Sequence, residues 1–475
     1  MIIANLEGKQ AFYASYFFSF FFNAFSLYWV AMVTPMGTLA AITIVAFYYT
    51  LALVVFNRLY RYKPVFGIVA MPFLWVGIEY FRTLSQFAFP WSDLGYSQAY
   101  YLVILQIVSV LSVHGLSFLI VTVNVLLWQV LRKTLSPERR LTAIFASVVI
   151  IVGLISYGWI VMPKYPEPGT MEVALLQGSI PLEEKWAPDN AQYTLDLYDS
   201  LARSVADTNI ELYIWPETAV PCYLSHNLAC QRAVGDIVEQ THAYNLVGAL
   251  GGKVINGEPR HFNSCFQVDP NGRIDKRYDK VKLVPFSETV PYQDELPFLR
   301  RDVLMKYLTF IKTYDIQWWS DFYPGDSADI FELPNANYGV LICFESAFPE
   351  FAREMIHKGA NFIVSITNDT WFGNSVGIYM HARIFLTRAV ENRCWMARVA
   401  NSGITYIVDP YGRIRERLGV FEVAALKGKI GMLSGYSFFT RHGDIVGRAS
   451  FLILVVTTLI LIALWFRQKL PRSRS

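Results

Sequence analysis

Long apolar stretches lie near both ends of the chain, whereas its middle has none. About 20 consecutive apolar residues are needed for a helix to cross a bilayer. Such stretches occupy residues 11–33, 37–56, 65–84, 100–131, 141–162 and 449–466, and residues 165–445 contain none. The pattern therefore predicts about five membrane-crossing helices in residues 1–164, a hydrophilic domain in residues 165–445, and a last crossing with a basic tail in residues 446–475.

Two of these stretches leave a choice of interpretation. Residues 100–131 suit either one tilted helix or a helix with an interfacial turn, and we favour the single helix. Residues 11–33 are too long for the apolar core of a secretory signal and lack a small-residue cleavage site. We interpret them as an uncleaved anchor.

The basic residues predict how the chain is oriented. Lys and Arg collect in the short loops on the cytoplasmic side of a membrane. Residues 34–36 and 85–99 contain no Lys or Arg. We therefore expect both termini in the cytoplasm and the hydrophilic domain on the outer side. The basic residues are Arg58, Arg61 and Lys63 in one loop, Arg132, Lys133, Arg139 and Arg140 in another, and Arg467, Lys469, Arg472 and Arg474 in the tail.

The hydrophilic domain alternates short apolar runs with helical patterns. Runs such as "YGVLIC" and "NFIVSIT" are rich in β-branched residues, as in strands buried on both faces. Helical spacing covers residues 188–207, 228–243, 347–358 and 379–394, and the turns "DPNG" and "DPYG" mark hairpins. Strands alternating with helices predict a mixed α/β layered domain.

Composition agrees with a membrane protein. The 475 residues are 54% hydrophobic and 17% charged, below the roughly 25% charged residues of ordinary soluble domains. The basic loops account for the net charge of +3, so charge gives no reason to expect nucleic acid as a partner.

All five cysteines fall in the hydrophilic domain: Cys222, Cys230, Cys265, Cys343 and Cys394. An odd number leaves at least one thiol unpaired, and spacing alone does not show whether Cys222 and Cys230 form a disulfide. The chain has no CxxC pair, and no His and Cys spacing fits a zinc site. We therefore expect no metal.

Residues suited to catalysis stand at the ends of predicted strands, where active sites of α/β sheets collect. Cys343 ends a strand in "LICFES", Glu217 follows another in "IWPET", and Lys280 and Glu288 lie in "YDKVKLVPFSE". Each has a plainer alternative. Cys343 could be a core residue, Glu217 a solvated turn residue, Lys280 a surface charge and Glu288 a cap.

In this order, the three motifs resemble the Glu-Lys-Cys triad of the nitrilase superfamily. With membrane helices on both sides, the chain resembles the apolipoprotein N-acyltransferases, which add the third acyl chain to bacterial lipoproteins. The resemblance implies an αββα nitrilase-like sandwich beside a membrane helical bundle, in the bacterial inner membrane and without a cofactor. Other matching segments are "QGSIPLEEKW", "NDTWFG", "ANSGIT", "WVGIEYFR" and "FPWSDLGYSQ".

The resemblance also implies roles for single residues. Cys343 would be the nucleophile, Glu217 the base, and Lys280 a cation that favours the thiolate and, with the backbone N–H after Cys343, holds the oxyanion. Glu288 would orient Lys280 by a charge-assisted hydrogen bond, and Glu345 would give similar support. Trp186 would line the acyl site, with core packing as the alternative.

The resemblance also implies two substrates, a phospholipid and a lipid-modified protein. A phospholipid, expected to be phosphatidylethanolamine, would donate an acyl chain to the α-amino group of the S-diacylglyceryl cysteine of an apolipoprotein, through a thioester and with ping-pong kinetics. One alternative is a membrane-tethered nitrilase-type amidase, in which water attacks the acyl-enzyme. Another is a lipid-binding paralogue without turnover.

The chain departs from the family pattern at two positions. Ser287 stands where the family usually has Gly, and Phe344 where a Tyr often follows the nucleophile. The membrane part is also about two helices shorter than the family's eight.

Three further features carry weaker expectations. Residues 292–323 combine helical spacing with Trp318 and Trp319, which predicts either a membrane-dipping lid or a helix packed on the domain core. Glu79 and Arg82 share a helix face, and we favour a structural ion pair over head-group binding. We interpret His381 as a structural or hydrogen-bonding residue.

Overall fold

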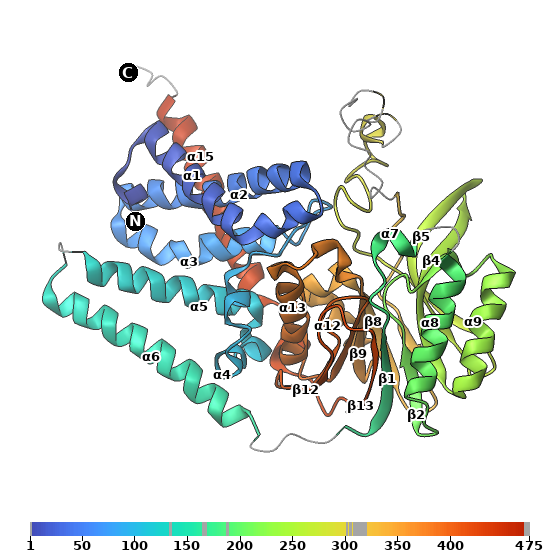
Figure 1. The fold of residues 1–475 in the computed structure, drawn as a ribbon. Helices are drawn as coiled ribbons and strands as arrows, with labels where there is room; N and C mark the ends of the chain where they lie inside the picture. Colours follow the sequence, from blue (N-terminus) through green and yellow to red (C-terminus); the bar gives the residue numbers. More distant parts are fainter. Residues whose placement is uncertain are drawn as a thin grey trace. The chain divides into compact units, whose positions relative to one another are not determined.

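The computed structural model describes residues 2–132, 135–163, 169–186, 190–300, 303, 306 and 321–469. It divides the chain into two compact units (Figure 1). A helical unit comprises residues 1–162 and 441–475, and an α/β unit comprises residues 163–440.

The helical unit contains the long apolar helices. Five of the described helices are long and apolar enough to cross a membrane. These are α2 (Pro35–Tyr62), α3 (Pro64–Phe81), α5 (Val108–Leu131), α6 (Pro137–Val161) and α15 (Ile445–Lys469).

The first apolar stretch forms α1 (Gly8–Leu27), which is not among these five. Its polar residues lower its hydropathy, yet two of them bond to the helix itself. Ser15 donates to the Ala11 carbonyl at 2.7 Å and Asn23 to the Ser19 carbonyl at 2.8 Å. Length and composition thus support five crossings where the sequence predicted six.

The prediction of one helix over residues 100–131 was wrong. The stretch forms a single turn, α4 (Leu102–Leu105), and then α5, which is broken at Ser112 (φ 65°, ψ 176°). The Ser112 hydroxyl accepts from the His114 N–H at 3.2 Å, as an N-cap does, and donates to Asp444 at 2.8 Å. A new helix start inside the apolar stretch therefore depends on a carboxylate far away in the sequence.

The ion pair predicted between Glu79 and Arg82 forms with a different carboxylate. Arg82 pairs with Asp93, with 3.3 Å between Nη1 and Oδ1. Glu79 instead accepts from the Trp75 indole and the Leu94 N–H, both at 2.9 Å. All three charged side chains are buried, so the buried ion pair exists, with Asp93 in the place expected for Glu79.

Short helices complete this unit: η1 (Ile2–Asn5), η2 (Tyr28–Met32), η3 (Leu94–Gln98) and, at the border of the units, α14 (Phe438–His442).

The described strands of the α/β unit form two mixed sheets. The first has the order β13-β1-β2-β4-β5-β6 with β3 beside β4, and the second β12-β11-β10-β9-β8-β7. The strands are β1 (Met171–Gln177), β2 (Ile210–Ile214), β3 (Val220–Tyr223), β4 (Tyr244–Ile255), β5 (Glu258–Val268), β6 (Ile274–Asp279), β7 (Ile330–Glu332), β8 (Asn337–Ile342), β9 (Phe362–Thr367), β10 (Met396–Ala400), β11 (Tyr406–Val408), β12 (Ile414–Arg417) and β13 (Ala424–Ile430).

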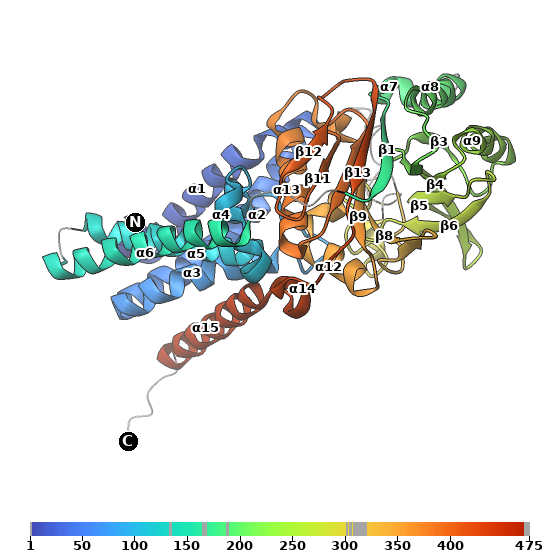
Figure 2. The same ribbon diagram turned by 90° about the horizontal axis from the view of Figure 1, so that it is seen from below.

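Helices cover the outer faces of both sheets (Figure 2). The pair α8 (Ala191–Ser204) and α9 (Leu228–Thr241) lies on the first sheet, and α12 (Pro349–His357) and α13 (Val376–Asn392) lie on the second. These are the four helices that the sequence predicted, with shifted ends. The unit is therefore the expected αββα sandwich.

Local sequence explains the hairpins. In "DPNG", the Asp269 carboxylate accepts from the Asn271 and Arg273 N–H groups, both at 2.9 Å, and Gly272 adopts φ 74°. A side chain that bonds two residues ahead and a glycine with positive φ are what such a turn requires. The turn joins the antiparallel strands β5 and β6 as predicted.

Cys222 and Cys230 form a disulfide, which settles the pairing that the sequence left open. It links β3 to the first turn of α9 across eight positions. Cys265, Cys343 and Cys394 are free thiols.

Replacing both Cys222 and Cys230 with Ser should lower the free energy of unfolding by about 2–3 kcal/mol, because closure of this short loop no longer restricts the unfolded chain. Denaturation of the detergent-solubilised protein would measure the change. Reducing agent should lower the stability of the native protein to that of the variant, and an unchanged native protein would contradict the prediction.

Candidate active site

Three elements bring the predicted catalytic residues together. Cys343 is the first residue of η6 (Cys343–Ala347), directly after β8, and adopts φ 52°. Glu217 lies in the loop after β2, and Lys280 directly follows β6. Glu217 is 6% and Lys280 1% exposed, which excludes the solvated turn and the surface charge.

Lys280 lies between two carboxylates. Its Nζ donates to Glu288 Oε1 at 2.9 Å and is 3.6 Å from Glu217 Oε1. Burial by itself lowers the pKa of Lys280, but Glu288, Glu217 and Cys343 raise it above its usual value. The raised pKa keeps Lys280 charged, and its hydrogen bond to Glu288 fixes the direction of the ammonium.

Glu217 is held at both oxygens. Oε1 accepts from Asn263 Nδ2 at 2.6 Å, and Oε2 accepts from the Asn368 N–H at 2.8 Å. The same Asn263 amide donates to Glu288 Oε1 at 3.0 Å. Asn263 on β5 therefore bridges the two carboxylates that flank Lys280. Sequence reasoning missed it, and "FNSC" carries no signal of that role.

The surroundings of the Cys343 thiol raise its pKa above its usual value. Burial raises its pKa first and the Glu217 carboxylate adds to this, whereas Lys280 and a hydrogen bond with Thr367 lower it. Lys280 thus acts in the expected direction, but burial outweighs it. Because burial favours the protonated thiol, attack by Cys343 would require a base that takes its proton.

Glu345 fixes the loop that carries Lys280. Its Oε1 accepts from the Tyr278 hydroxyl at 2.8 Å and from the Val281 N–H at 2.7 Å, and its Oε2 accepts from the Ile342 N–H at 2.8 Å. Burial raises the pKa of Glu345 to about 7, against these hydrogen bonds. The carboxylate ties the residue before Cys343 to the residue after Lys280.

The two departures from the family pattern are both accommodated. The residue with positive φ in the turn before Glu288 is Phe286 (φ 63°), next to Ser287. The Phe344 ring is buried edge-on against Phe348, with 5.2 Å between centroids. A glycine at position 287 is therefore not what the turn requires here.

Trp186 follows α7 (Leu182–Lys185), and 47% of its side chain is exposed. Core packing is therefore excluded for Trp186. The predicted lid residues 301–302, 304–305 and 307–320, with Trp318 and Trp319, lie outside the described residues. Directly after them, Phe322 N–H donates to the Glu288 carbonyl at 2.8 Å.

Lys185 is a second buried lysine, which sequence reasoning did not single out. It is 0% exposed, and its Nζ donates to the Glu217 carbonyl at 3.1 Å. Burial lowers its pKa to about 7, with Glu217 opposing. Lys185 therefore holds the backbone of the base without adding a fixed charge.

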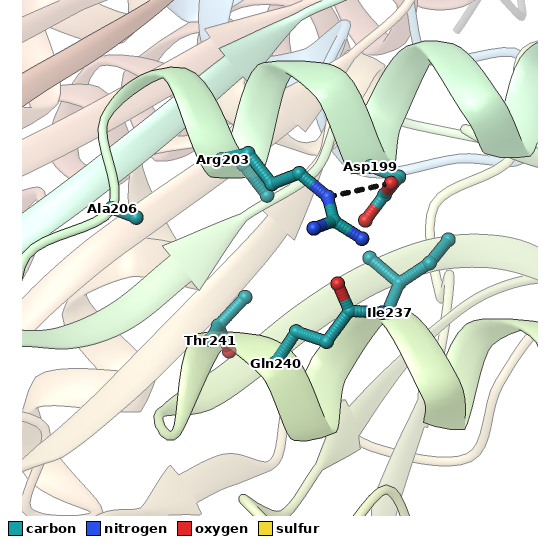
Figure 3. Close-up of a pocket in the computed structure, with 7 residues that line it drawn as sticks. Asp199, Arg203, Ala206, Ile237, Gln240 and Thr241 are labelled. Carbon is teal, nitrogen blue, oxygen red and sulfur yellow. Dashed lines mark hydrogen bonds and ion pairs between the residues drawn. The ribbon is translucent and has the colours of Figure 1, made fainter.

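Two pockets lie away from these residues. A cavity of about 20 Å³ between α8 and α9 is lined by Asp199, Arg203 and Gln240 among others (Figure 3). It has room for about one water molecule. An open depression of about 660 Å³ lies beside the disulfide, at Tyr223 and His226. Neither is lined by Cys343, Glu217 or Lys280.

The site combines a thiol, a carboxylate and a buried ammonium, which are the groups that acyl transfer through a covalent intermediate requires. Among the described residues, no group of three His, Cys, Asp or Glu side chains could hold a metal ion. Fold and site together define the class as a nitrilase-like carbon-nitrogen hydrolase domain joined to membrane helices.

Comparison with known proteins identifies the family. Residues 172–429 match the carbon-nitrogen hydrolase model, and residues 1–126 match the apolipoprotein N-acyltransferase N-terminal domain. The apolipoprotein N-acyltransferase of Geobacter metallireducens is 34% identical over 85% of this chain and 75% of its own length. That of Chlorobaculum tepidum is 30% identical over 94% and 87%. The chain belongs to the apolipoprotein N-acyltransferase family.

Among solved structures, an amidase from Nesterenkonia sp. is 18% identical and aligns over 59% of this chain and 95% of its own, with a TM-score of 0.41.

Lys185→Met should change how stability depends on pH. The folded state holds Lys185 with a pKa of about 7, whereas the unfolded chain binds this proton up to about pH 10.4. The unfolded state thus binds more protons between these values, so native stability gains up to about 1.4 kcal/mol per pH unit from this group. The variant lacks the gain.

Thermal unfolding of both proteins between pH 7 and 9.5 measures this prediction. The melting temperature of the native protein should rise relative to the Lys185→Met variant as the pH increases. A constant difference would show that Lys185 keeps its proton.

Proposed function

We propose that this chain transfers an acyl chain from a phospholipid to the α-amino group of the S-diacylglyceryl cysteine of apolipoproteins, with Cys343 as the nucleophile. One observation carries the proposal. The Glu217 carboxylate lies 3.6 Å from the Lys280 ammonium, and both are close enough to the Cys343 thiol, at the end of strand β8, to shift its pKa.

In the first half-reaction, Glu217 takes the thiol proton while Cys343 Sγ attacks the ester carbonyl of the donor. The carbonyl π electrons move to oxygen, and Lys280 stabilises the oxyanion. Collapse of the tetrahedral intermediate breaks the bond from carbon to the ester oxygen. The departing lysophospholipid oxygen receives the proton from Glu217, which leaves a thioester on Cys343.

In the second half-reaction, the neutral amine of the acceptor attacks the thioester. Glu217 takes a proton from the attacking nitrogen, and the bond from carbon to sulfur breaks. The Cys343 thiolate then regains the proton from Glu217. The products are an amide and the resting thiol, so each substrate uses the same base.

We expect phosphatidylethanolamine as the donor and diacylated apolipoproteins as acceptors. The names of the relatives support the acceptor class. The membrane helices support a donor drawn from the bilayer.

We propose that the α/β unit faces the outer side of the bacterial inner membrane. The basic residues lie in the connections between α2 and α3 and between α5 and α6 and in the adjoining helix ends, as expected for the cytoplasmic side. The disulfide of the α/β unit fits an oxidising compartment. With these loops in the cytoplasm, α6 leads outward to the α/β unit and α15 leads back, which leaves the C-terminus in the cytoplasm.

The side of the N-terminus depends on α1. We propose that α1 is a sixth crossing, which returns the N-terminus to the cytoplasm. Its 20 residues span about 30 Å, the thickness of the hydrocarbon core. Ser15, Ser19 and Asn23 are buried, whereas Phe17, Phe21 and Phe25 are exposed. The outer face of α1 is therefore more apolar than its composition suggests.

Intact-protein mass spectrometry after incubation with phosphatidylethanolamine tests the activity. The native protein should gain one hydroxylamine-sensitive acyl adduct, and Cys343→Ala should gain none. A diacylated lipopeptide should discharge the adduct. Discharge by water alone would indicate an amidase, and no adduct with any of several phospholipids would indicate a lipid-binding paralogue without turnover.

Cysteine labelling tests the place of α1. In a Cys343→Ala background, Asn5→Cys should resist a membrane-impermeant maleimide in spheroplasts and react after permeabilisation. Asn256→Cys, at the tip of the β4–β5 hairpin, should react in both cases and serves as the matched control. Labelling of Asn5→Cys in intact spheroplasts would place the N-terminus outside.

A further inference from the structure

A buried chain of polar side chains contacts the main chain of Cys343. The Ser346 hydroxyl donates to the Cys343 carbonyl at 2.8 Å, and His381 Nε2 lies 3.2 Å from the same oxygen and 3.1 Å from Ser346 Oγ. His381 Nδ1 lies 2.8 Å from Asp369 Oδ1. Ser346, His381 and Asp369 are all 0% exposed.

The state of Asp369 assigns the donor role of His381 Nδ1. Arg398 donates to Asp369 Oδ2 at 2.6 Å. Burial by itself raises the pKa of Asp369, but Arg398 and His381 lower it below its usual range, so the carboxylate stays ionised. An ionised carboxylate only accepts, so His381 Nδ1 donates to it. A neutral imidazole with its proton on Nδ1 has an acceptor at Nε2, which suits the Ser346 hydroxyl, whereas only an imidazolium would also donate to the Cys343 carbonyl.

Cys343 needs such support because of its backbone. Its φ of 52° lies in the left-handed region, which a side chain other than Gly rarely adopts unless surrounding contacts hold it there. The thiol must nevertheless stay close to Glu217 and Lys280 for attack. Strand β8 fixes the residues before Cys343, and the contacts of Ser346 and His381 with its carbonyl fix its peptide group on the other side.

We propose that Asp369, His381 and Ser346 form a positioning relay that holds Cys343 in its attacking conformation through contacts with its carbonyl oxygen. None of the three touches a reacting atom. Asp369 orients the imidazole, and His381 and Ser346 hold the carbonyl. A shift of about 1 Å in a catalytic group can cost on the order of 100-fold in rate, so the relay controls acylation more than substrate binding.

The inference rests on Cys343 as the nucleophile, and the test separates the two claims. Full-length His381→Ala, His381→Gln and Ser346→Ala would be compared with the native protein for the rate of acyl-enzyme formation from phosphatidylethanolamine. His381→Ala should slow acylation about 100-fold and Ser346→Ala about 10-fold, with the KM for lipid within about twofold. His381→Gln retains an N–H donor and should restore at least a fifth of the native rate.

The chain offers a matched control. His357 also contacts a backbone carbonyl, that of Thr440, at 2.6 Å between Nε2 and O. His357→Gln should leave the acylation rate unchanged. An equal loss in His357→Gln, or folded His381→Ala and Ser346→Ala variants with rates within twofold of native, would overturn the relay. If His381→Ala does not fold, Ser346→Ala decides.

Alkylation of Cys343 by iodoacetamide gives a readout that needs no lipid. The relay variants should react about fivefold more slowly, because the thiol no longer stays beside Lys280. Absence of an acyl adduct on the native protein would defeat the proposed function alone, and the alkylation rates would still judge the relay. Unchanged alkylation in both variants would overturn it.

Discussion

One buried ammonium organises the active site. The Lys280 side chain is almost completely buried. Removing a charge from water costs several kcal/mol unless close partners compensate. Glu288 at 2.9 Å and Glu217 at 3.6 Å provide that compensation. Glu217 comes from the loop after β2, whereas Lys280 and Glu288 come from the segment after β6, so the two segments must pack together for the buried ammonium to be tolerable.

The same requirement explains the amide at Asn263. Two carboxylates that approach one ammonium repel each other, and a neutral donor between them reduces that repulsion without adding another charge. Asn263 Nδ2 contacts both Glu217 and Glu288. The Asn368 N–H occupies the second oxygen of Glu217. These two hydrogen bonds fix the Glu217 carboxylate in one orientation.

The sequence predicted those parts whose signal is local. Glu217, Lys280 and Cys343 stand in short motifs at strand ends, and four helices and two hairpin turns followed from periodicity and turn chemistry. Asn263 and the break at Ser112 could not be predicted in this way. Each depends on a partner distant in the sequence, namely the two carboxylates for Asn263 and Asp444 for Ser112.

The partners of charged residues were equally hard to predict. Arg82 pairs with Asp93 in a connecting segment, although Glu79 lies one turn away on its own helix. Helical spacing shows which residues share a face, but the folded loops decide which acceptor comes closest. The disulfide between Cys222 and Cys230 was equally hard to predict, because the spacing permits it but only the structure shows it.

The raised pKa of Cys343 has a chemical consequence for both half-reactions. A buried thiol that keeps its proton is protected from adventitious electrophiles until a carbonyl carbon is in place and Glu217 can take the proton. In the second half-reaction the same preference drives the proton back to sulfur once the thiolate has left. A site that favours the thiol therefore favours departure of sulfur as the thiol after the amide has formed, and Lys280 would stabilise the charge of the tetrahedral intermediates.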